Sequence, residues 1–233
     1  MHAGSFAPPV RPKRGIGRSL GLVLPCVLAA ALALPVRAGA ESVVVAFGDS
    51  LVAGWGLPAE ASFPRQLEAA LRARGVAARV VDAGVSGETT AGGLARLDWT
   101  FDGYAGAALA ILELGANDGP LRGLDPQQTE ANLDAMLTAL QRRGMAVLLA
   151  GMRAPPNLGP DYVAAFDAIY PRLAARHGVV FYPFFLDGVA AVPRLNQADG
   201  IHPNAAGVAV IVERIVPFVL LALAAPGRRR GAS

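Results

Sequence analysis

The 233-residue sequence is short of the residues that most often carry chemistry or cross-links. It has one cysteine, Cys26, and three histidines, His2, His177 and His202. Charged residues make up 17% of the chain, against 53% apolar residues. A single cysteine forms no internal disulfide, and so high an apolar content excludes a disordered chain. The sequence therefore predicts a globular protein that depends on its apolar core and has few candidates for a catalytic base.

Basic residues exceed acidic ones by 21 to 18, but the excess is confined to the N-terminal end. Residues 1–40 contain no acid and five of the basic residues, which are Arg11, Lys13, Arg14, Arg18 and Arg37. Without these five, 16 basic and 18 acidic side chains remain, a net charge of about −2. Because the body of the chain has no basic excess, we expect no nucleic-acid partner.

Residues 1–40 have the three parts of a signal peptide. A basic segment precedes an apolar run from Leu20 to Val36, and Ala38-Gly39-Ala40 supplies the small side chains that a signal peptidase requires. Cleavage there makes Glu41 the first mature residue and removes Cys26. The expected location of the mature protein is the periplasm or the exterior of the cell.

The alternative for this leader is an uncleaved anchor helix, because the apolar run approaches the length of a bilayer span. Pro25 and Pro35 within the run, and the small residues behind it, favour cleavage. We expect the mature chain to consist of one domain, residues 41–225, and a basic tail, residues 226–233.

After the leader, short apolar segments alternate with longer segments of helical periodicity. Five apolar segments predict strands, at Val43–Phe47, Ala78–Ala83, Ala107–Leu114, Met145–Ala150 and Val179–Tyr182. Four segments between them predict helices, at Phe63–Arg74, Thr90–Leu97, Pro126–Arg142 and Tyr162–His177. This alternation predicts an α/β protein with a parallel sheet and helices on both faces.

Polar segments that contain glycine follow the first three predicted strands. They are Gly48-Asp49-Ser50, Gly84 to Gly87 and Gly115 to Gly119. Ligands of such sheets bind beyond the carboxyl ends of the strands. We therefore expect these three loops to meet at one functional site.

Ser50 directly follows the first predicted strand, behind Gly48. A serine in this place can lie at a helix N-terminus, where backbone N–H groups and the helix dipole stabilise negative charge. The alternative is that Ser50 is only a helix N-cap, a position in which serine is common. The Gly-x-Ser-x-Gly elbow of the α/β-hydrolases is absent, because Val52 stands in place of its last glycine.

A serine nucleophile requires a base, and only His177 and His202 remain after export. Asp199 precedes His202 by three residues across Gly200, a spacing at which the carboxylate can hold one ring nitrogen and leave the other as the base. The alternative is an Asp-Gly turn with an exposed histidine. His177 lies at the predicted end of a helix, where histidine commonly interacts with the last carbonyls, so we expect it to be structural.

Two of the loops offer donors for an oxyanion. Gly87 can present a backbone N–H without a side chain in the way, and Asn117 can point its N–H₂ group from the next loop. Both residue types are also common in ordinary turns. With Ser50, Asp199 and His202 they complete the set that an acyl transfer needs. We expect no metal or other cofactor, because the mature chain has no cysteine and two unmatched histidines.

Four segments together resemble, in order, the four sequence blocks of the SGNH (GDSL) hydrolases. They are Gly48-Asp49-Ser50-Leu51, Ser86-Gly87-Glu88-Thr89-Thr90, Gly115-Ala116-Asn117-Asp118 and Asp199-Gly200-Ile201-His202-Pro203. Residues 151–159 and 168–171 are similar to the family branch of periplasmic multifunctional thioesterases, lysophospholipases and arylesterases. The resemblance implies a three-layer, flavodoxin-like fold with a five-stranded parallel sheet, and hydrolysis of carboxylic esters and acyl thioesters.

Position within these blocks also implies roles. Ser50 corresponds to the nucleophile, His202 to the base and Asp199 to its orienting partner. The Ser50 N–H, the Gly87 N–H and the Asn117 side chain correspond to the oxyanion hole. The residues expected to bind substrate are Asp49, Leu51, Met152, Pro155, Asn157, Tyr162 and Ile201.

The sequence departs from this branch at two places. Ala116 replaces a glycine that the branch often has before the asparagine, a change of one methyl group that we expect to be tolerated. Pro120 is an additional residue after Gly119, close to Asn117. We expect it to alter the pocket wall and the acyl-chain preference, and to leave the reaction type unchanged.

Two alternatives to an esterase or thioesterase stay open at this point. A carbohydrate O-deacetylase of the same family would need a flat, polar pocket. A non-catalytic doubly wound protein would use its glycine-rich loops to bind a small anion. For the esterase we expect a monomer that acts on small-molecule or lipid acyl esters and thioesters.

The C-terminal region contains an apolar run, Ile215 to Ala225, ahead of Arg228-Arg229-Arg230. The run is too short to span a bilayer, and Pro217 interrupts it. We expect the last helix of the core, begun by Pro203, and a weak membrane-surface contact is the alternative.

Overall fold

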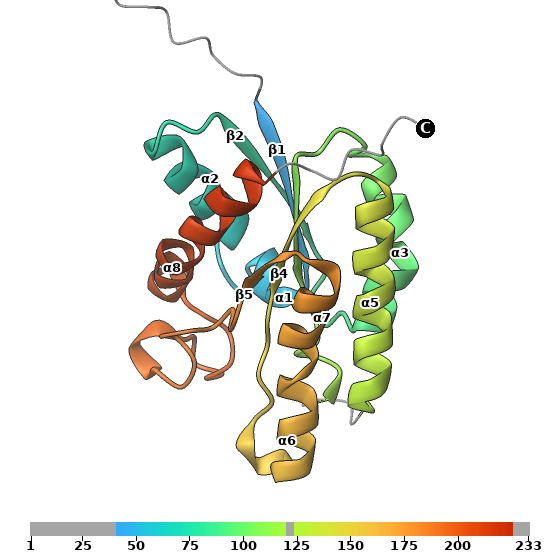
Figure 1. Cartoon of the computed structure of the whole chain (residues 1–233). Helices are drawn as coiled ribbons and strands as arrows, with labels where there is room; N and C mark the ends of the chain where they lie inside the picture. The colour runs from blue at the N-terminus through green and yellow to red at the C-terminus, as the bar shows by residue number, and fades with distance from the viewer. Residues whose placement is uncertain (1–40, 120–123, 226–233) are drawn as a thin grey trace, which may run out of the picture. The chain divides into compact units, whose positions relative to one another are not determined.

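A parallel sheet of five strands forms the centre of the computed structural model, which describes residues 41–119 and 124–225 (Figure 1). The strands are β1 (Ser42–Gly48), β2 (Ala78–Gly84), β3 (Leu109–Glu113), β4 (Ala146–Ala150) and β5 (Val180–Tyr182). Their order is β2-β1-β3-β4-β5, and every neighbouring pair is parallel. The predicted α/β class and the five-stranded parallel sheet are confirmed.

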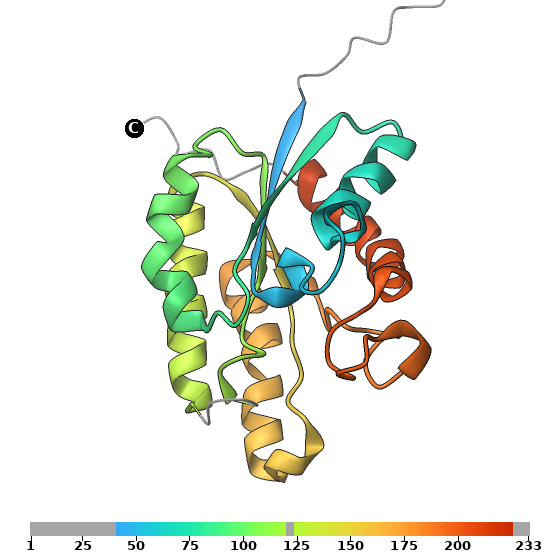
Figure 2. The same ribbon diagram turned by 180° about the vertical axis from the view of Figure 1, so that it is seen from behind.

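Helices cover both faces of the sheet, which gives three layers (Figures 1 and 2). On one face, α2 packs against β2 and α8, and α8 packs against β4 and β5. On the other, α5 packs between α3 and α7 and contacts β4. The helices are α1 (Ser50–Ala53), α2 (Phe63–Ala73), α3 (Thr90–Asp102), α5 (Pro126–Arg142), α6 (Pro160–Asp167), α7 (Ile169–His177) and α8 (Ala205–Ala224). Short 3₁₀ turns lie at Ala59–Ala61, Pro156–Leu158 and Pro193–Leu195.

The central strands are the most deeply buried. All five residues of β3 are buried, and so are Val44 to Gly48 of β1. Such strands have helices on both faces, which explains why their sequences are apolar at consecutive positions instead of alternating.

The predicted third strand, Ala107–Leu114, is longer than the observed β3. The Ala107 N–H donates to the Tyr104 carbonyl in a turn, so the strand begins after it. Glu113 is the last residue of β3 in register with its neighbours, opposite Gly48 and Ala150. The other four strands begin and end within one residue of their predicted bounds.

The predicted helix Tyr162–His177 is two helices, α6 and α7, which meet at Ala168. Pro171 has no N–H to donate to the Asp167 carbonyl, so it removes a hydrogen bond that a continuous helix would need. The predicted helix at Thr90–Leu97 continues to Asp102 as α3.

The last helix also differs from the prediction at its start. Pro203 does not begin it, because Pro203 forms an isolated β-bridge with Asn196. Asn204 is the N-cap instead, since its side chain accepts the N–H groups of Ala206 and Gly207, each at 3.0 Å.

α8 is longer than the apolar run noted in the sequence, Ile215 to Ala225. Within the described residues it is the one helix that is long and apolar enough to cross a membrane by length and composition. Val208, Ile211, Ile215 and Val219 are nevertheless buried at helical spacing, on the side that packs against the sheet. The expected role as a core helix is confirmed for this part of the chain. The predicted leader, Pro120 and the arginine-rich tail lie outside the described residues.

The strand order fixes where a site is to be expected. From β1 the chain runs to β2 on one side, and β3 lies on the other side of β1. Strand order therefore reverses between β1 and β3, and ligands of such sheets bind beyond the carboxyl ends at this reversal. Ser50 follows β1 at this point, and Ala116 and Asn117 follow β3.

Candidate active site

The turn after β1 presents Ser50 at the start of α1. Glycine is required at position 48, because a Cβ atom there would lie 2.6 Å from the Glu113 carbonyl oxygen. Asp49 caps α1 by accepting the Leu51 N–H at 2.9 Å, so Ser50 is the first helical residue. The N-cap alternative for Ser50 is therefore wrong. Because α1 is a single turn, its dipole is small, and stabilisation of charge falls to individual N–H groups.

Ser50, His202 and Asp199 form a continuous chain of hydrogen bonds. His202 Nε2 lies 2.9 Å from Ser50 Oγ, and His202 Nδ1 lies 2.7 Å from Asp199 Oδ2. The other oxygen of Asp199 accepts the N–H groups of Ile201 at 2.9 Å and His202 at 3.0 Å. A carboxylate held in this way favours the tautomer with hydrogen on Nδ1, which leaves Nε2 to accept the serine proton.

The same contacts set the charge of Asp199. The hydrogen bond from His202, followed by the two backbone N–H groups, lowers the pKa of Asp199 to about 2. Asp199 therefore carries a negative charge at any pH near neutrality, as an orienting carboxylate must.

Gln197 ties the His202 loop to the segment that follows α1. Its backbone N–H donates to the His202 carbonyl at 2.8 Å, and its Nε2 donates to the Trp55 carbonyl at 2.7 Å. A Cβ atom at Gly56, where φ is +73°, would lie 2.3 Å from Gln197 Oε1. Gln197 could not be predicted from the sequence, because a link between loops 142 positions apart leaves no local pattern.

His177 lies in a different environment, away from Ser50. It is the last residue of α7, its Nε2 lies 2.8 Å from Asp134 Oδ1, and its Nδ1 lies 3.2 Å from Gln141 Oε1. The Gln141 amide also donates to the His177 carbonyl at 2.8 Å. Both ring nitrogens are occupied by neighbouring helix side chains, which agrees with the predicted structural role.

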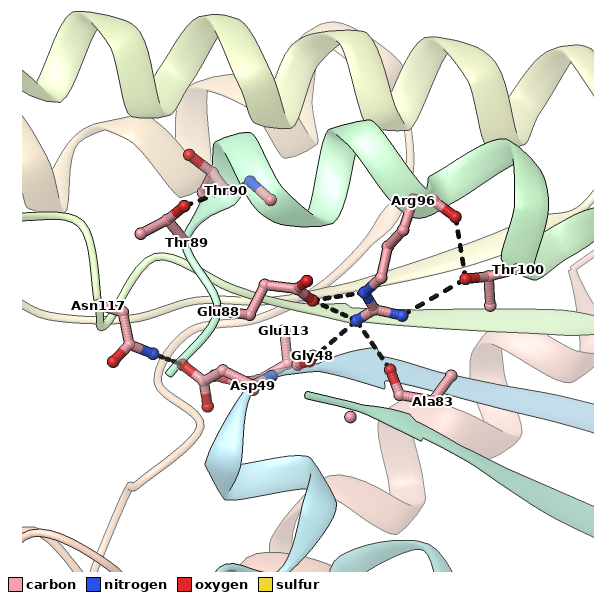
Figure 3. Close-up of polar contacts among 12 residues, drawn as sticks. Gly48, Asp49, Ala83, Glu88, Thr89, Thr90, Arg96, Thr100, Glu113 and Asn117 are labelled. Carbon is pink, nitrogen blue, oxygen red and sulfur yellow. Dashed lines mark hydrogen bonds and ion pairs between the residues drawn. The ribbon is translucent and has the colours of Figure 1, made fainter. Parts of the chain in front are cut away.

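Asn117 is held at the site by a hydrogen bond to Asp49. Its Nδ2 donates to Asp49 Oδ2 at 2.7 Å (Figure 3). An amide group has two N–H bonds, so one is left for the cavity that Asn117 lines together with Ser50. Gly87 lines the same cavity with φ at +77°, a conformation that favours glycine, and a Cβ atom there would have open space around it. Glycine is favoured at position 87 because of this backbone conformation, and not because a side chain would clash with its neighbours.

Asp118 joins the Asn117 loop to the start of α3. Its Oδ1 accepts the Thr90 N–H at 2.8 Å, and its Oδ2 accepts the hydroxyls of Thr90 at 2.5 Å and Thr129 at 2.9 Å. Asp118 is fully buried, so these bonds replace the water that its carboxylate loses. The loops that carry Gly87 and Asn117 are thereby held to each other.

Glu113 is another buried acid, and it lies next to the nucleophile turn. Glu113, the last residue of β3, is fully buried, and its Oε2 accepts the Asp49 N–H at 3.4 Å. Its Oε1 has no hydrogen-bond partner among the described residues. Burial raises the pKa of Glu113 well above its usual value and that of Asp49 to about 6. Glu113 could not be predicted as part of the site, because in the sequence it lies near the end of an apolar strand segment.

A cavity of about 540 Å³ opens at Ser50 and His202. Five of the residues predicted to bind substrate line it, namely Asp49, Leu51, Met152, Pro155 and Ile201. The structure does not bring the other two to this cavity: Asn157 is exposed in a 3₁₀ turn, and the Tyr162 hydroxyl donates to the Leu124 carbonyl. Lining residues that the sequence did not reveal include Trp55 and Leu186. The described residues contain no cluster of three His, Cys, Asp or Glu side chains that could hold a metal ion.

Comparison with known proteins identifies the family. Residues 46–210 match the GDSL-like Lipase/Acylhydrolase family. The chain belongs to this family. The four blocks that carried the resemblance all lie in the matched range, and the expected hydrolase class of this GDSL-like acylhydrolase is confirmed.

Relatives of this acylhydrolase cover most of its length. It is 41% identical over 187 residues to Esterase TesA of Pseudomonas aeruginosa, an alignment that covers 80% of this chain and 92% of that protein. It is 40% identical to Thioesterase 1/protease 1/lysophospholipase L1 of Escherichia coli (strain K12), over 73% of this chain and 80% of that protein. Among solved structures, the SGNH-hydrolase family esterase AlinE4 is 49% identical, with a TM-score of 0.67 over 80% of this chain and 99% of that chain.

Proposed function

We propose that this chain is a serine hydrolase that cleaves carboxylic esters and acyl thioesters through an acyl-enzyme on Ser50. The observation that carries the proposal is the bonded chain from Ser50 Oγ through the His202 ring to Asp199, at 2.9 and 2.7 Å. Nucleophile, base and orienting acid in this geometry are the requirement for nucleophilic acyl transfer.

In the first half of the reaction, His202 Nε2 takes the proton of Ser50 Oγ while the oxygen attacks the carbonyl carbon. The tetrahedral oxyanion is stabilised by the Ser50 and Gly87 N–H groups and by the second N–H of Asn117. His202 then gives its proton to the leaving alcohol or thiol, and the carbon–oxygen or carbon–sulfur bond breaks. Asp199 stabilises the imidazolium that forms between these two transfers.

In the second half, water hydrolyses the acyl group on Ser50. His202 takes a proton from the water as its oxygen attacks the acyl carbon, and the same donors stabilise the new oxyanion. Collapse of this intermediate releases the carboxylic acid, and His202 returns the proton to Ser50 Oγ.

The cavity walls favour an acyl chain over a sugar. Apolar side chains dominate the lining, from Leu51, Trp55, Met152, Pro155, Leu186 and Ile201. An O-deacetylase would instead need several polar groups around the ring of its sugar. Two relatives whose names include an esterase or a thioesterase support the same choice.

A fluorophosphonate probe tests the proposal together with Ser50→Ala. We expect the wild-type protein to be modified at Ser50, as identified by peptide mass spectrometry, and to hydrolyse 4-nitrophenyl butyrate. Ser50→Ala should lose labelling and roughly 10⁴-fold or more of kcat while its melting temperature is retained. Near-normal turnover in that variant would refute the assignment of Ser50.

The preferred acyl length is measured with 4-nitrophenyl acetate, butyrate and octanoate and with the matching coenzyme A thioesters. An apolar cavity predicts higher kcat/KM for the longer chains. Activity confined to acetate would favour the O-deacetylase alternative.

We also propose export and a monomeric mature protein. The basic, apolar and small-residue segments of residues 1–40 support export. Mass spectrometry of the protein expressed from the 233-residue sequence should find an N-terminus at Glu41, and size-exclusion chromatography with light scattering should give one mature chain. An intact N-terminus with membrane retention would point to an anchor helix instead.

A further inference from the structure

Arg96 of α3 reaches back to the carboxyl ends of two strands. Its Nη2 donates to the Gly48 carbonyl at 3.2 Å and to the Ala83 carbonyl at 2.9 Å (Figure 3). Gly48 is the last residue of β1 and lies two positions before Ser50, and Ala83 lies near the end of β2. The guanidinium also lies 3.9 Å from the centre of the buried Phe47 ring. Arg96 therefore holds the backbone from which the nucleophile turn starts.

The same guanidinium is paired with Glu88. Arg96 Nε lies 2.6 Å from Glu88 Oε2, and Nη2 forms an ion pair with the same oxygen. The two side chains are 19% and 8% exposed, which places the pair largely out of water. A partly buried pair of this kind is screened less by solvent than a surface pair. Removal of one partner therefore leaves the other charge unpaired and only partly accessible to water.

Glu88 follows Gly87 directly, so the pair also restrains the Gly87 loop. The Glu88 N–H donates to the Val85 carbonyl at 3.1 Å, and Thr89 caps α3 by accepting the Gly92 N–H at 3.2 Å. A Cβ atom at Gly92 would lie 3.3 Å from Glu88 Cγ, so the Glu88 side chain lies close against the first turn of α3. One guanidinium thus contacts the ends of β1 and β2 and, through Glu88, the loop between β2 and α3.

We propose that Arg96 and Glu88 are positioning residues of the catalytic site, which set the distance between Ser50 and the Gly87 backbone. The inference rests on the proposed acyl-transfer function. Neither side chain lines the cavity, so neither is expected to touch substrate. Their effect passes through the two backbone segments that they hold, one with the nucleophile and one with an oxyanion donor.

The proposal predicts a specific kinetic effect. An oxyanion donor contributes only when it lies at the right place for the transition state, and a displacement of about 1 Å can cost on the order of 100-fold in rate. Loss of the pair should therefore lower kcat and leave KM almost unchanged. A purely structural ion pair would instead lower the melting temperature and leave the turnover of each folded molecule intact.

The test compares Arg96→Gln, Arg96→Lys and Glu88→Gln with the wild type. For each variant kcat is expressed per active site, counted by burst titration with a fluorophosphonate, and KM is measured with 4-nitrophenyl butyrate. We expect kcat to fall by about 10- to 100-fold in Arg96→Gln and by about tenfold in Glu88→Gln, with KM within twofold. Arg96→Lys, which keeps the charge, should recover part of the loss.

Arg143→Gln is the matched control. Arg143 also bonds side chains of α3, Asp98 at 2.7 Å and Asp102 at 2.8 Å, but these acids are 80% and 70% exposed and lie away from the cavity. Its kcat should equal that of the wild type.

The outcomes separate the inference from the function on which it rests. An inactive, unlabelled wild-type protein would overturn the proposed function. An active wild type with Arg96→Gln and Glu88→Gln variants that are folded and keep kcat within twofold would overturn the positioning role alone. If Arg96→Gln does not fold, the Glu88→Gln variant alone tests the positioning role. It keeps the guanidinium on both strand carbonyls and removes only its charged partner.

Discussion

His177 and His202 both bond a carboxylate through one ring nitrogen, and their second nitrogens separate their roles. The second nitrogen of His202 faces Ser50 Oγ at 2.9 Å, whereas that of His177 faces the Gln141 side chain at 3.2 Å. A base needs an acceptor nitrogen within reach of the proton that it removes, and His202 alone of the two has this geometry.

Replacement of each histidine by alanine tests this difference. His202→Ala should lower kcat by about 10³-fold or more, because Ser50 loses its base. His177→Ala should keep kcat within about twofold and lower only the melting temperature, because it breaks contacts between α5 and α7. Steady-state assays and thermal melts of both variants provide the measurement. Comparable losses of kcat would mean that the wrong histidine had been assigned.

Asn117 combines two contacts that can be tested separately. One N–H is held by Asp49 at 2.7 Å, and the other is assigned to the oxyanion. Asn117→Ala should lower kcat by about 10²- to 10³-fold, the usual loss for one donor, with little change in KM. Asp49→Ala should lower kcat less, because it frees the amide without removing it. A larger loss in Asp49→Ala would assign Asp49 a role beyond holding Asn117 and the Leu51 N–H.

Some of these residues could be predicted from the sequence, and others could not. Asp199 and His202 are three residues apart across a glycine, so their contact is local and their chemistry predicts it. Ser50 lies 152 positions from His202, so no local spacing joins them. They were paired before the fold was known because the mature chain offers only two histidines, and the resemblance to a family supported that pairing. Arg96, Gln197 and Glu113 act through contacts with backbone groups of distant segments, and such contacts impose no pattern on nearby residues.

At the scale of elements, hydrophobic periodicity predicts which segments form helices and strands. Packing and hydrogen bonding determine the residues at which they begin and end. The apolar segments located all five strands, because a buried strand needs apolar residues on both faces. The break between α6 and α7 lies in a stretch of continuous helical periodicity, and the missing N–H of Pro171 explains it. The start of α8 was misplaced because Pro203 fits a first helical position equally well, while the Asn204 side chain makes the bonds of the cap.

Asn204 holds more than the start of α8. Besides the two N–H groups that it caps, its Nδ2 donates to the carbonyls of Arg194 at 2.9 Å and Asn196 at 3.2 Å. Loss of an N-cap costs about 1 kcal/mol, up to about 2 kcal/mol. Asn204→Ala should therefore lower the free energy of unfolding by about 2 kcal/mol, the upper end of this range.

Asp125→Ala is the comparison for this effect in urea denaturation. Asp125 caps α5 with a single bond to the Gln127 N–H at 2.9 Å, so its loss should be nearer to about 1 kcal/mol. Equal losses in the two variants would show that the three additional bonds of Asn204 contribute nothing to stability.

At the scale of the whole molecule, the strand order places the proposed active site, and the acids buried there lower the stability of the fold. The order β2-β1-β3-β4-β5 puts the reversal beside β1, so the loops after β1, β2 and β3 converge there. The sequence predicted the alternation of elements and the convergence of these loops, and the structure supplied the strand order, because periodicity does not say which strands are neighbours. Two acids are buried at this point, Asp49 directly after β1 and Glu113 as the last residue of β3.

These two acids predict how stability depends on pH. Burial raises the pKa of Asp49 to about 6 from 3.8, and it raises that of Glu113 well above 4.5. Between the unfolded and folded values the native state binds more protons than the unfolded state, so stability falls as pH rises through this window. The contribution of the pair is complete below the unfolded pKa values and is lost above the folded ones.

Glu113→Gln removes one of these titrations while it keeps the shape of the side chain. We expect its melting temperature at pH 8 to equal or exceed that of the wild type, and the fall from pH 5 to pH 8 to be smaller. Glu130→Gln is the control of opposite sign, because the hydrogen bond from Arg172 lowers the pKa of Glu130, and that group stabilises the fold above its unfolded pKa. Melting curves across this pH range measure both variants. A lower melting temperature of Glu113→Gln at pH 8 would mean that the ionised acid is stabilised where it lies, and that Glu113 helps to hold the nucleophile turn by its charge.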